Sequence, residues 1–234
     1  MLYLLLFLSC MITFEESPDK LAVSFESGET AKAISVRSPL KSSGKIVILR
    51  ENEILGHGSG NYFKSGKYKF ILTAAHVLRH EFSSFVVDGD ELVKLKTLYI
   101  NNERDIAISV PEKDLQTIES TKFRANNKFD LVGKTIYYAG FPQDMDKSLF
   151  KGFVSRCTKE WIMIQSFALP GSSGSVIFDF WGRAIGVISA VKLGAYGFSP
   201  YPELVETAVI VQKVDFIDGK FIRELFESEQ KSKF

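Results

Sequence analysis

From Lys45 onward, the chain is a succession of short apolar runs separated by turn-forming residues. The runs are rich in Val, Ile, Phe and Tyr, and clusters of Gly, Asn, Asp or Lys divide them. They comprise Ile46–Leu49, Phe70–Thr73, Phe85–Val87, Leu92–Ile100, Ile106–Val110, Thr135–Ala139, Phe153–Cys157, Trp161–Gln165, Val176–Phe178, Ala184–Ala190 and Thr207–Val214. Many short strands at this spacing are typical of all-β barrels and sandwiches, whereas strands that alternate with helical patterns indicate a parallel sheet. We therefore predict an all-β fold.

Two further features organise the predicted strands. A polar stretch around Lys113–Asp130 divides them into two groups of similar size. After the last strand, the segment IDGKFIRELFESEQ places Phe221, Leu225 and Phe226 on one face of a helix. We predict a C-terminal helix over residues 217–230.

The N-terminal segment has a different composition. Leu2–Phe14 is an apolar run, shorter than the ~20 residues that a membrane-spanning helix needs, and its length suits the apolar region of a signal peptide. No Lys or Arg precedes it, so a buried N-terminal strand or an imperfect start site is the alternative. We predict that residues 1–14 direct export or membrane association, and that the polar residues 15–44 form a lead-in to a domain over 45–234.

Charge and cysteine content exclude two classes of protein. Lys and Arg number 29 against 28 Asp and Glu, so the chain lacks the basic excess of a nucleic-acid binder. Cys10 and Cys157 are the only cysteines, too few for a disulfide-rich scaffold or a four-cysteine zinc site. The core must therefore be held together by packing.

The stretch PGSSGSVIFD at 170–179 carries three serines in four residues. A Gly/Ser cluster is by default a turn, and a serine hydroxyl becomes a nucleophile only where a base, usually a histidine held by a carboxylate, takes its proton. The three histidines, His57, His76 and His80, all precede this loop, which excludes the order of an α/β-hydrolase. The only Asp before His76 is Asp19, in the lead-in, which disfavours the subtilisin order. The order that remains is His, Asp, Ser.

Three local contexts fit this order. His76 ends the apolar strand in KFILTAAHVL, Asp105 starts the alternating strand in NERDIAISV, and Ser173 lies in the tight turn PGSSGS. Gly171 and Gly174 allow consecutive backbone N–H groups to point at one spot. The N–H groups of Gly171 and Ser173 are therefore predicted to form an oxyanion hole, in which each donor contributes about 3–4 kcal/mol to transition-state stabilisation.

The motifs LTAAHV, DIAI and PGSSGS, in this order, resemble the three catalytic blocks of the chymotrypsin/trypsin-like serine peptidases, especially the disulfide-free high-temperature-requirement type and related bacterial or viral members. The similarity runs over about residues 45–214 and includes GSGNYFKSGKYKF before the histidine, and AGFPQD and KGFVS after the polar divide. The resemblance implies two six-stranded antiparallel β-barrels, about 45–115 and 130–214, with the active site in the cleft between them. It implies Ser173 as nucleophile, His76 as general base and then acid, and Asp105 as the group that orients His76.

The same resemblance implies how a polypeptide substrate is bound. Phe167 would lie at the base of the pocket for the residue before the cut, and Ser189, Ala190 and Val191 would form the strand that pairs with the substrate backbone. No acidic residue occupies the pocket base, so a preference for Lys or Arg is disfavoured and small or medium apolar side chains are expected. Ser172 stands where trypsin-like zymogens carry an activation carboxylate, so activation of that kind is not expected.

Two other functions compete with an active serine endopeptidase. The first is a catalytically silent double barrel that acts as a binding module. The second is a metalloenzyme that uses His76 and His80, but no third ligand accompanies them and the His-Glu-x-x-His arrangement is absent. His57 and His80 fit none of the three blocks, and we interpret both as surface or loop residues. No metal or other cofactor is expected.

Overall fold

The structure is a computed structural model that describes residues 37–51, 53–78, 82–127, 130–143, 145–194 and 203–231. The predictions for residues 1–14, for most of the lead-in and for His80 lie outside these residues. The last part of the expected lead-in, 37–44, forms a short helix, α1 (Arg37–Ser42), and the start of the first strand. No helix within the described ranges is long and apolar enough to span a bilayer.

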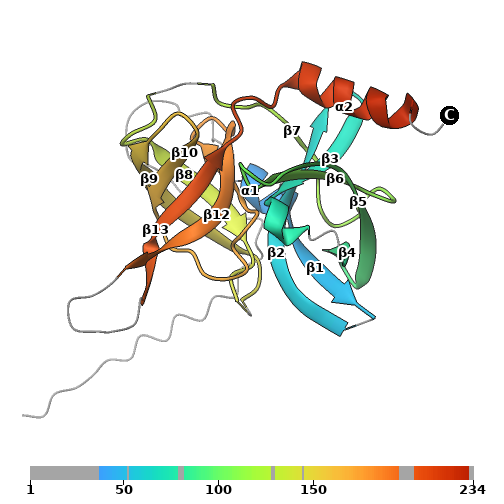
Figure 1. Ribbon diagram of the computed structural model, residues 1–234, viewed down its shortest axis with the longest axis horizontal. Coiled ribbons are helices and arrows are strands. Elements are labelled where there is room, and N and C mark those ends of the chain that lie inside the picture. The colour runs from blue at the N-terminus through green and yellow to red at the C-terminus, as the bar shows by residue number, and fades with distance from the viewer. Residues whose placement is uncertain are drawn as a thin grey trace, which may run out of the picture. The chain divides into compact units, whose positions relative to one another are not determined.

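The first barrel is a closed ring of six antiparallel strands. The ring runs β1-β4-β5-β6-β3-β2, and β1 pairs with β2 to close it (Figure 1). Its strands are β1 (Ser43–Arg50), β2 (Glu53–Ser65), β3 (Tyr68–Thr73), β4 (Ser83–Asp88), β5 (Glu91–Asn101) and β6 (Ile106–Pro111). A two-residue strand, β7 (Thr121–Lys122), adds to β2 in parallel. Closure removes the free strand edges that would otherwise expose unpaired backbone groups.

The second barrel is also closed and antiparallel, with the order β10-β13-β12-β11-β8-β9. Its strands are β8 (Thr135–Gly140), β9 (Ser148–Cys157), β10 (Trp161–Gln165), β11 (Val176–Asp179), β12 (Ala184–Gly194) and β13 (Glu203–Lys213). The chain then enters the helix α2 (Gly219–Lys231). The prediction of two six-stranded barrels and a C-terminal helix is confirmed.

Strand β2 is missing from the apolar runs of the sequence because its middle is glycine-rich. Gly58 and Gly60 lie where side chains from neighbouring elements already fill the space. A Cβ on Gly58 would lie 2.7 Å from the side chain of Val77, and one on Gly60 would lie 2.8 Å from the side chains of Ile46 and Ile71. These glycines let β2 pass close to its neighbours, and they also hide the strand from a search for β-branched residues.

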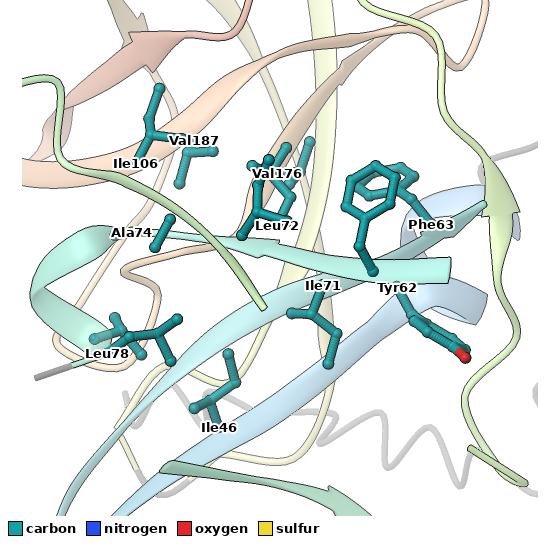
Figure 2. Packing of buried hydrophobic residues seen from close by; sticks show 14 of the residues in the cluster. Ile46, Tyr62, Phe63, Ile71, Leu72, Ala74, Leu78, Ile106, Val176 and Val187 are labelled. Carbon is teal, nitrogen blue, oxygen red and sulfur yellow. The ribbon is translucent and has the colours of Figure 1, made fainter. Parts of the chain in front are cut away.

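One apolar cluster joins the two barrels. Leu72 and Ile106, from the first barrel, belong to the same buried cluster as Val176 and Val187, from the second, and all four are fully buried (Figure 2). The remainder of the second barrel has its own core, built on Ile136, Tyr138 and their neighbours. The strands next to His76, Asp105 and Ser173 therefore contribute residues to one packed apolar interface.

Helix α2 follows the second barrel but packs on the first. The side chain of Asp218 accepts a hydrogen bond from the amide of Phe221 at 2.7 Å, which satisfies one of the free N–H groups at the start of the helix. Phe226 stacks on Tyr68 with ring centroids 4.6 Å apart, and Phe221 meets Tyr99 edge-on at 5.3 Å. The predicted apolar face is the one that covers the first barrel.

Leu72→Ala tests the joint core. Leu72 is fully buried, so truncation leaves a cavity beside residues of both barrels, and the free energy of unfolding should fall by about 2–5 kcal/mol. Chemical denaturation measures this difference. Leu149→Ala, on the exposed side of β9, is the control and should change stability by less than about 0.5 kcal/mol. Equal effects of the two variants would contradict a shared core at Leu72.

Candidate active site

His76 and Asp105 meet where β3 ends and β6 begins. These strands are antiparallel neighbours, and Thr73 pairs with Ala107, so the residue three beyond Thr73 and the residue two before Ala107 emerge at the same end. His76 lies in the short helix η2 (Ala75–Val77), just after β3. Its ring Nδ1 is 2.8 Å from Asp105 Oδ2, and its amide donates to Asp105 Oδ1 at 2.9 Å. The two predicted partners are thus held together by two hydrogen bonds.

Asp105 has a third donor, which the sequence did not reveal. Ser189, on β12 of the second barrel, donates its hydroxyl hydrogen to Asp105 Oδ2 at 2.5 Å. Ser189 was predicted to pair with substrate, and no sequence pattern signals this additional contact. Burial by itself would raise the pKa of Asp105, but hydrogen bonds from the His76 ring, Ser189 and the His76 amide outweigh it and hold the pKa below its usual value. Asp105 therefore stays ionised beside the imidazole.

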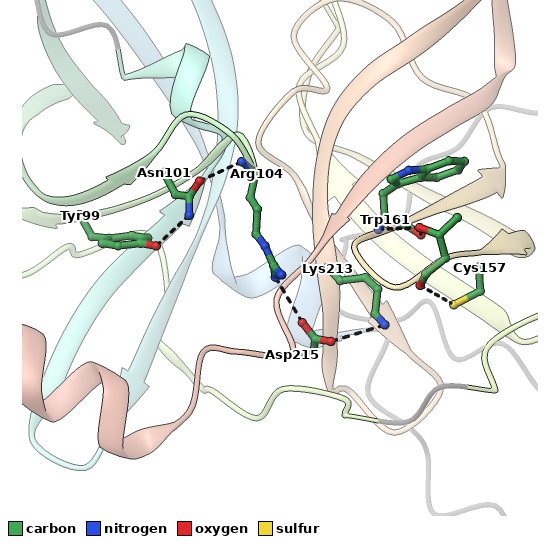
Figure 3. Close-up of polar contacts among 8 residues, drawn as sticks. Tyr99, Asn101, Arg104, Cys157, Trp161, Lys213 and Asp215 are labelled. Atoms are coloured by element: carbon green, nitrogen blue, oxygen red, sulfur yellow. Dashed lines mark hydrogen bonds and ion pairs between the residues drawn. The ribbon is translucent and has the colours of Figure 1, made fainter.

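The turn that carries Asp105 is connected by an ion pair to the segment that follows the last strand of the second barrel. Arg104 lies 3.6 Å from Asp215, which is also 3.4 Å from Lys213 (Figure 3). The Arg104 guanidinium stands over the ring of Phe216, 4.8 Å from its centroid, and the Arg104 amide donates to the Asn101 side chain. Asp105 itself adopts a left-handed conformation, with φ of +47°. Such backbone strain persists only where surrounding contacts hold it.

The loop 166–175, which contains Ser173, is folded by its own backbone and by the neighbouring strand β12. Gly171 and Gly174 have φ of +95° and +89°, values that favour glycine. The amide of Ser172 donates to Leu169 O at 2.9 Å, and that of Gly174 donates to Ile188 O at 2.8 Å. The side chain of Ser172 is buried and accepts a hydrogen bond from the Leu169 amide. Ser173 is the half-exposed serine of the loop.

The structure brings Ser173 next to the strand that leads to His76. Its carbonyl accepts the amide hydrogen of Ser59, on β2, at 2.8 Å. A Cβ on the following residue, Gly174, would lie 3.2 Å from the Ala74 amide nitrogen, two residues before His76. Ser173 Oγ makes no hydrogen bond to His76 within the described residues. Such a bond is often long without substrate and shortens in the reacting complex.

Two amides of the loop, those of Gly171 and Ser173, are the candidate oxyanion donors. Neither Gly171 N–H nor Ser173 N–H has a hydrogen-bond partner among the residues that the structure describes. The Gln143 amide donates to Pro170 O at 2.6 Å. Because the C=O and N–H of a trans peptide point in opposite directions, this bond aims the Gly171 N–H away from Gln143.

His57 is not the surface or loop residue that the sequence suggested. It lies on β2, half-buried, with its ring Nε2 3.0 Å from Phe141 O. A Cβ on Gly171 would lie 2.5 Å from the same ring nitrogen. The glycine-led strand gave no apolar signal, so nothing in the sequence placed His57 beside the Ser173 loop.

The residues predicted to bind substrate lie in the Ser173 loop and on β12. Phe167 lies within the loop, half-buried, with its ring stacked on Phe150 at 5.9 Å and its carbonyl accepting a hydrogen bond from the Tyr138 hydroxyl. Ala190 is exposed on β12, and Val191 follows it in the same strand. Among the described residues, no group of three or more His, Cys, Asp or Glu side chains is placed to hold a metal ion.

Comparisons with known proteins converge on one fold. The family model of the trypsin-like peptidase domain matches residues 58–187. The crystal structure of the serine endoprotease from Yersinia pestis is similar, with a TM-score of 0.63 over 86% of this chain and 68% of that chain. The sequence identity is 16%, so this likeness concerns the fold alone. A search of curated protein sequences gave no significant match.

Asp105→Asn tests the ionised carboxylate through stability. A carboxyl group whose pKa is lowered by folding stabilises the folded state above its unfolded pKa, and this stabilisation is lost as the pH falls through the folded pKa. The variant should therefore unfold more easily than the wild type at pH 7, and the difference should shrink below about pH 4. Denaturant unfolding at several pH values measures it. A difference that stays constant down to pH 2 would show that the Asp105 charge is not stabilised.

Proposed function

The chain belongs to the trypsin-like peptidase domain family, and from this premise we propose that it is a serine endopeptidase. The observation that carries the proposal is the hydrogen-bonded pair of His76 and Asp105 beside the Ser173 loop. Because Asp105 occupies Nδ1 of the ring, Nε2 is the nitrogen left to exchange protons with a nucleophile. Family membership alone does not establish catalysis, because proteins that share a fold can differ in function.

In the proposed reaction, Ser173 Oγ attacks the carbonyl carbon of a peptide bond while His76 Nε2 takes the hydroxyl proton. Asp105 keeps the ring oriented and stabilises the imidazolium that forms. The oxyanion of the tetrahedral intermediate accepts hydrogen bonds from the amides of Gly171 and Ser173. His76 then gives its proton to the leaving amine, and a water molecule, activated by His76, releases the acyl group from Ser173.

The substrate is proposed to be an extended polypeptide that adds to β12. Val176 and Val187 are the last paired residues of β11 and β12, so beyond Val187 that side of β12 has no neighbouring strand in the described part of the chain. An extended peptide can hydrogen-bond to such a free edge at Ser189, Ala190 and Val191. Phe167, stacked on Phe150, supports an apolar pocket floor with no carboxylate, which favours small or medium apolar residues over Lys or Arg.

Ser173→Ala is the direct test of the nucleophile. The variant should lose labelling by a fluorophosphonate probe, and casein cleavage should fall by about 10⁴–10⁶-fold, because no other hydroxyl replaces Ser173. The matched control is Ser175→Ala in the same loop, since the Ser175 hydroxyl is buried and has no hydrogen-bond partner in the part of the chain that the structure describes. The control should keep both labelling and cleavage. If the wild type and Ser173→Ala label equally, or if neither does, the catalytic assignment is wrong and a silent binding module becomes the better proposal.

The combined variant of His76→Ala and Ser173→Ala tests whether the residues act as a unit. Each single variant should lower turnover by about 10⁴–10⁶-fold, and the combination should lower it scarcely further, because either loss already prevents acylation. Single-turnover cleavage of a peptide substrate at high enzyme concentration provides the measurement. Losses that multiply would mean that His76 and Ser173 serve independent steps.

A further inference from the structure

Two residues of β2 contact the segment that supports the Ser173 loop. His57 and Ser59 are two positions apart on this strand, so their side chains project from the same face. His57 Nε2 lies 3.0 Å from Phe141 O, and Ser59 Oγ accepts the Phe141 amide hydrogen at 3.0 Å. The first barrel therefore bonds to both polar groups of Phe141, which follows the last residue of β8.

Ser59 also contacts the loop directly. Its hydroxyl donates to Gly171 O at 2.8 Å, and its amide donates to Ser173 O at 2.8 Å. Its carbonyl accepts the hydroxyl hydrogen of Thr73, at the end of the strand that leads to His76. The residue is fully buried. Its polar groups thus join the proposed oxyanion residues to the strand before the proposed base.

The Phe141–Gln143 segment fixes the other side of Gly171. Gln143, itself at φ of +48°, donates its amide hydrogen to Pro170 O and so sets the plane of the Pro170–Gly171 peptide. A Cβ on Gly171 would lie 2.3 Å from Phe141 O. Gly171 is therefore enclosed by Phe141, His57 and the Ser59 hydroxyl, and only its N–H lacks a partner among the described residues.

We propose that His57 and Ser59 are positioning residues for the oxyanion hole. They hold Phe141–Gln143 against the loop, so that the Gly171 N–H stays directed at the oxygen that becomes negatively charged. The inference rests on the proposed serine endopeptidase activity and assigns to the first barrel a role beyond carrying His76 and Asp105. Neither residue contacts the reacting atoms. Both act through Phe141 and Gly171.

Ser59→Ala should lower kcat by about 10–100-fold and change KM by less than about threefold. Loss of one donor from an oxyanion hole costs about 10²–10³ in kcat, and a misdirected donor loses part of that. Binding of substrate in its ground state does not use the hole, so KM should change little. Inhibition by a peptide aldehyde, which forms a tetrahedral adduct, should weaken by the same factor as kcat. A rise in KM of similar size, with kcat unchanged, would overturn the proposal.

The matched control is Ser43→Ala. Ser43 is also buried, and its hydroxyl donates to Ala139 O at 3.0 Å, but within the described residues it makes no hydrogen bond to the Ser173 loop. Removal of this hydrogen bond should leave kcat within about threefold of the wild type. If Ser43→Ala lowers kcat as much as Ser59→Ala does, the effect is general loosening and the positioning role is wrong.

His57 is tested by substitutions that keep or remove its donor. Gln can place an amide N–H near the position of Nε2, whereas Leu fills the space without a donor. His57→Leu should lower kcat by about 10-fold, and His57→Gln should recover most of the loss. Equal losses in the two variants would exclude the Phe141 hydrogen bond as the reason. The two variants at the half-buried His57 also serve as the test if Ser59→Ala does not fold.

Amide hydrogen exchange separates this inference from the proposed activity, because it needs no catalysis. The amides of Phe141 and Gln143 are hydrogen-bonded and should exchange slowly in the wild type, and both should exchange at least about 10-fold faster in Ser59→Ala but not in Ser43→Ala. Unchanged exchange at Gln143 would refute the positioning role even in an active enzyme. Faster exchange in a protein that never labels with fluorophosphonate would refute the peptidase activity and leave the support of Gly171 standing.

Discussion

The candidate site depends on the Asp105 carboxylate, because both barrels donate hydrogen bonds to it. The first barrel supplies the ring and amide of His76, and the second supplies the hydroxyl of Ser189. A hydrogen bond to a charged group contributes about 1.5–3 kcal/mol, so a shift of one barrel against the other would sacrifice a strong contact. The orientation of His76 and the alignment of the barrels are therefore a single constraint.

A second junction between the two barrels lies at Ser59. Its hydrogen bonds cross from the first barrel to Phe141, Gly171 and Ser173 of the second. Leu72, from the first barrel, packs in one cluster with Val176 and Val187, from the second. Apolar packing at this interface lowers the local dielectric, which strengthens the hydrogen bonds of both junctions. Neither barrel contains the complete site, and the interface assembles it.

The sequence predicted those parts of the molecule whose signals are local. Runs of β-branched and aromatic residues located most strands, and the spacing of Phe221, Leu225 and Phe226 identified the face of α2 that packs on the first barrel. The order of the motifs predicted that His76 and Asp105 would meet. Contacts between distant segments could not be predicted from the sequence. The hydrogen bonds of Ser189 with Asp105 and of His57 with Phe141 depend on how the two barrels face each other. Strand β2 was missed as an apolar run because close packing demands glycine at positions where strand propensity would demand a large residue.

The loop around Ser173 is held by neutral hydrogen bonds, and this bears on how its conformation can be controlled. Trypsin-like zymogens carry a carboxylate just before the catalytic serine. A buried carboxylate without a partner is costly, so a loop that contains one is stable only when a cation pairs with it. Ser172 presents a hydroxyl at that position, buried and bonded to the Leu169 amide. The adjacent carbonyls are satisfied by Ser59 and by backbone amides. The loop 166–175 contains no charged residue, so its conformation does not depend on the pairing of a buried charge within it.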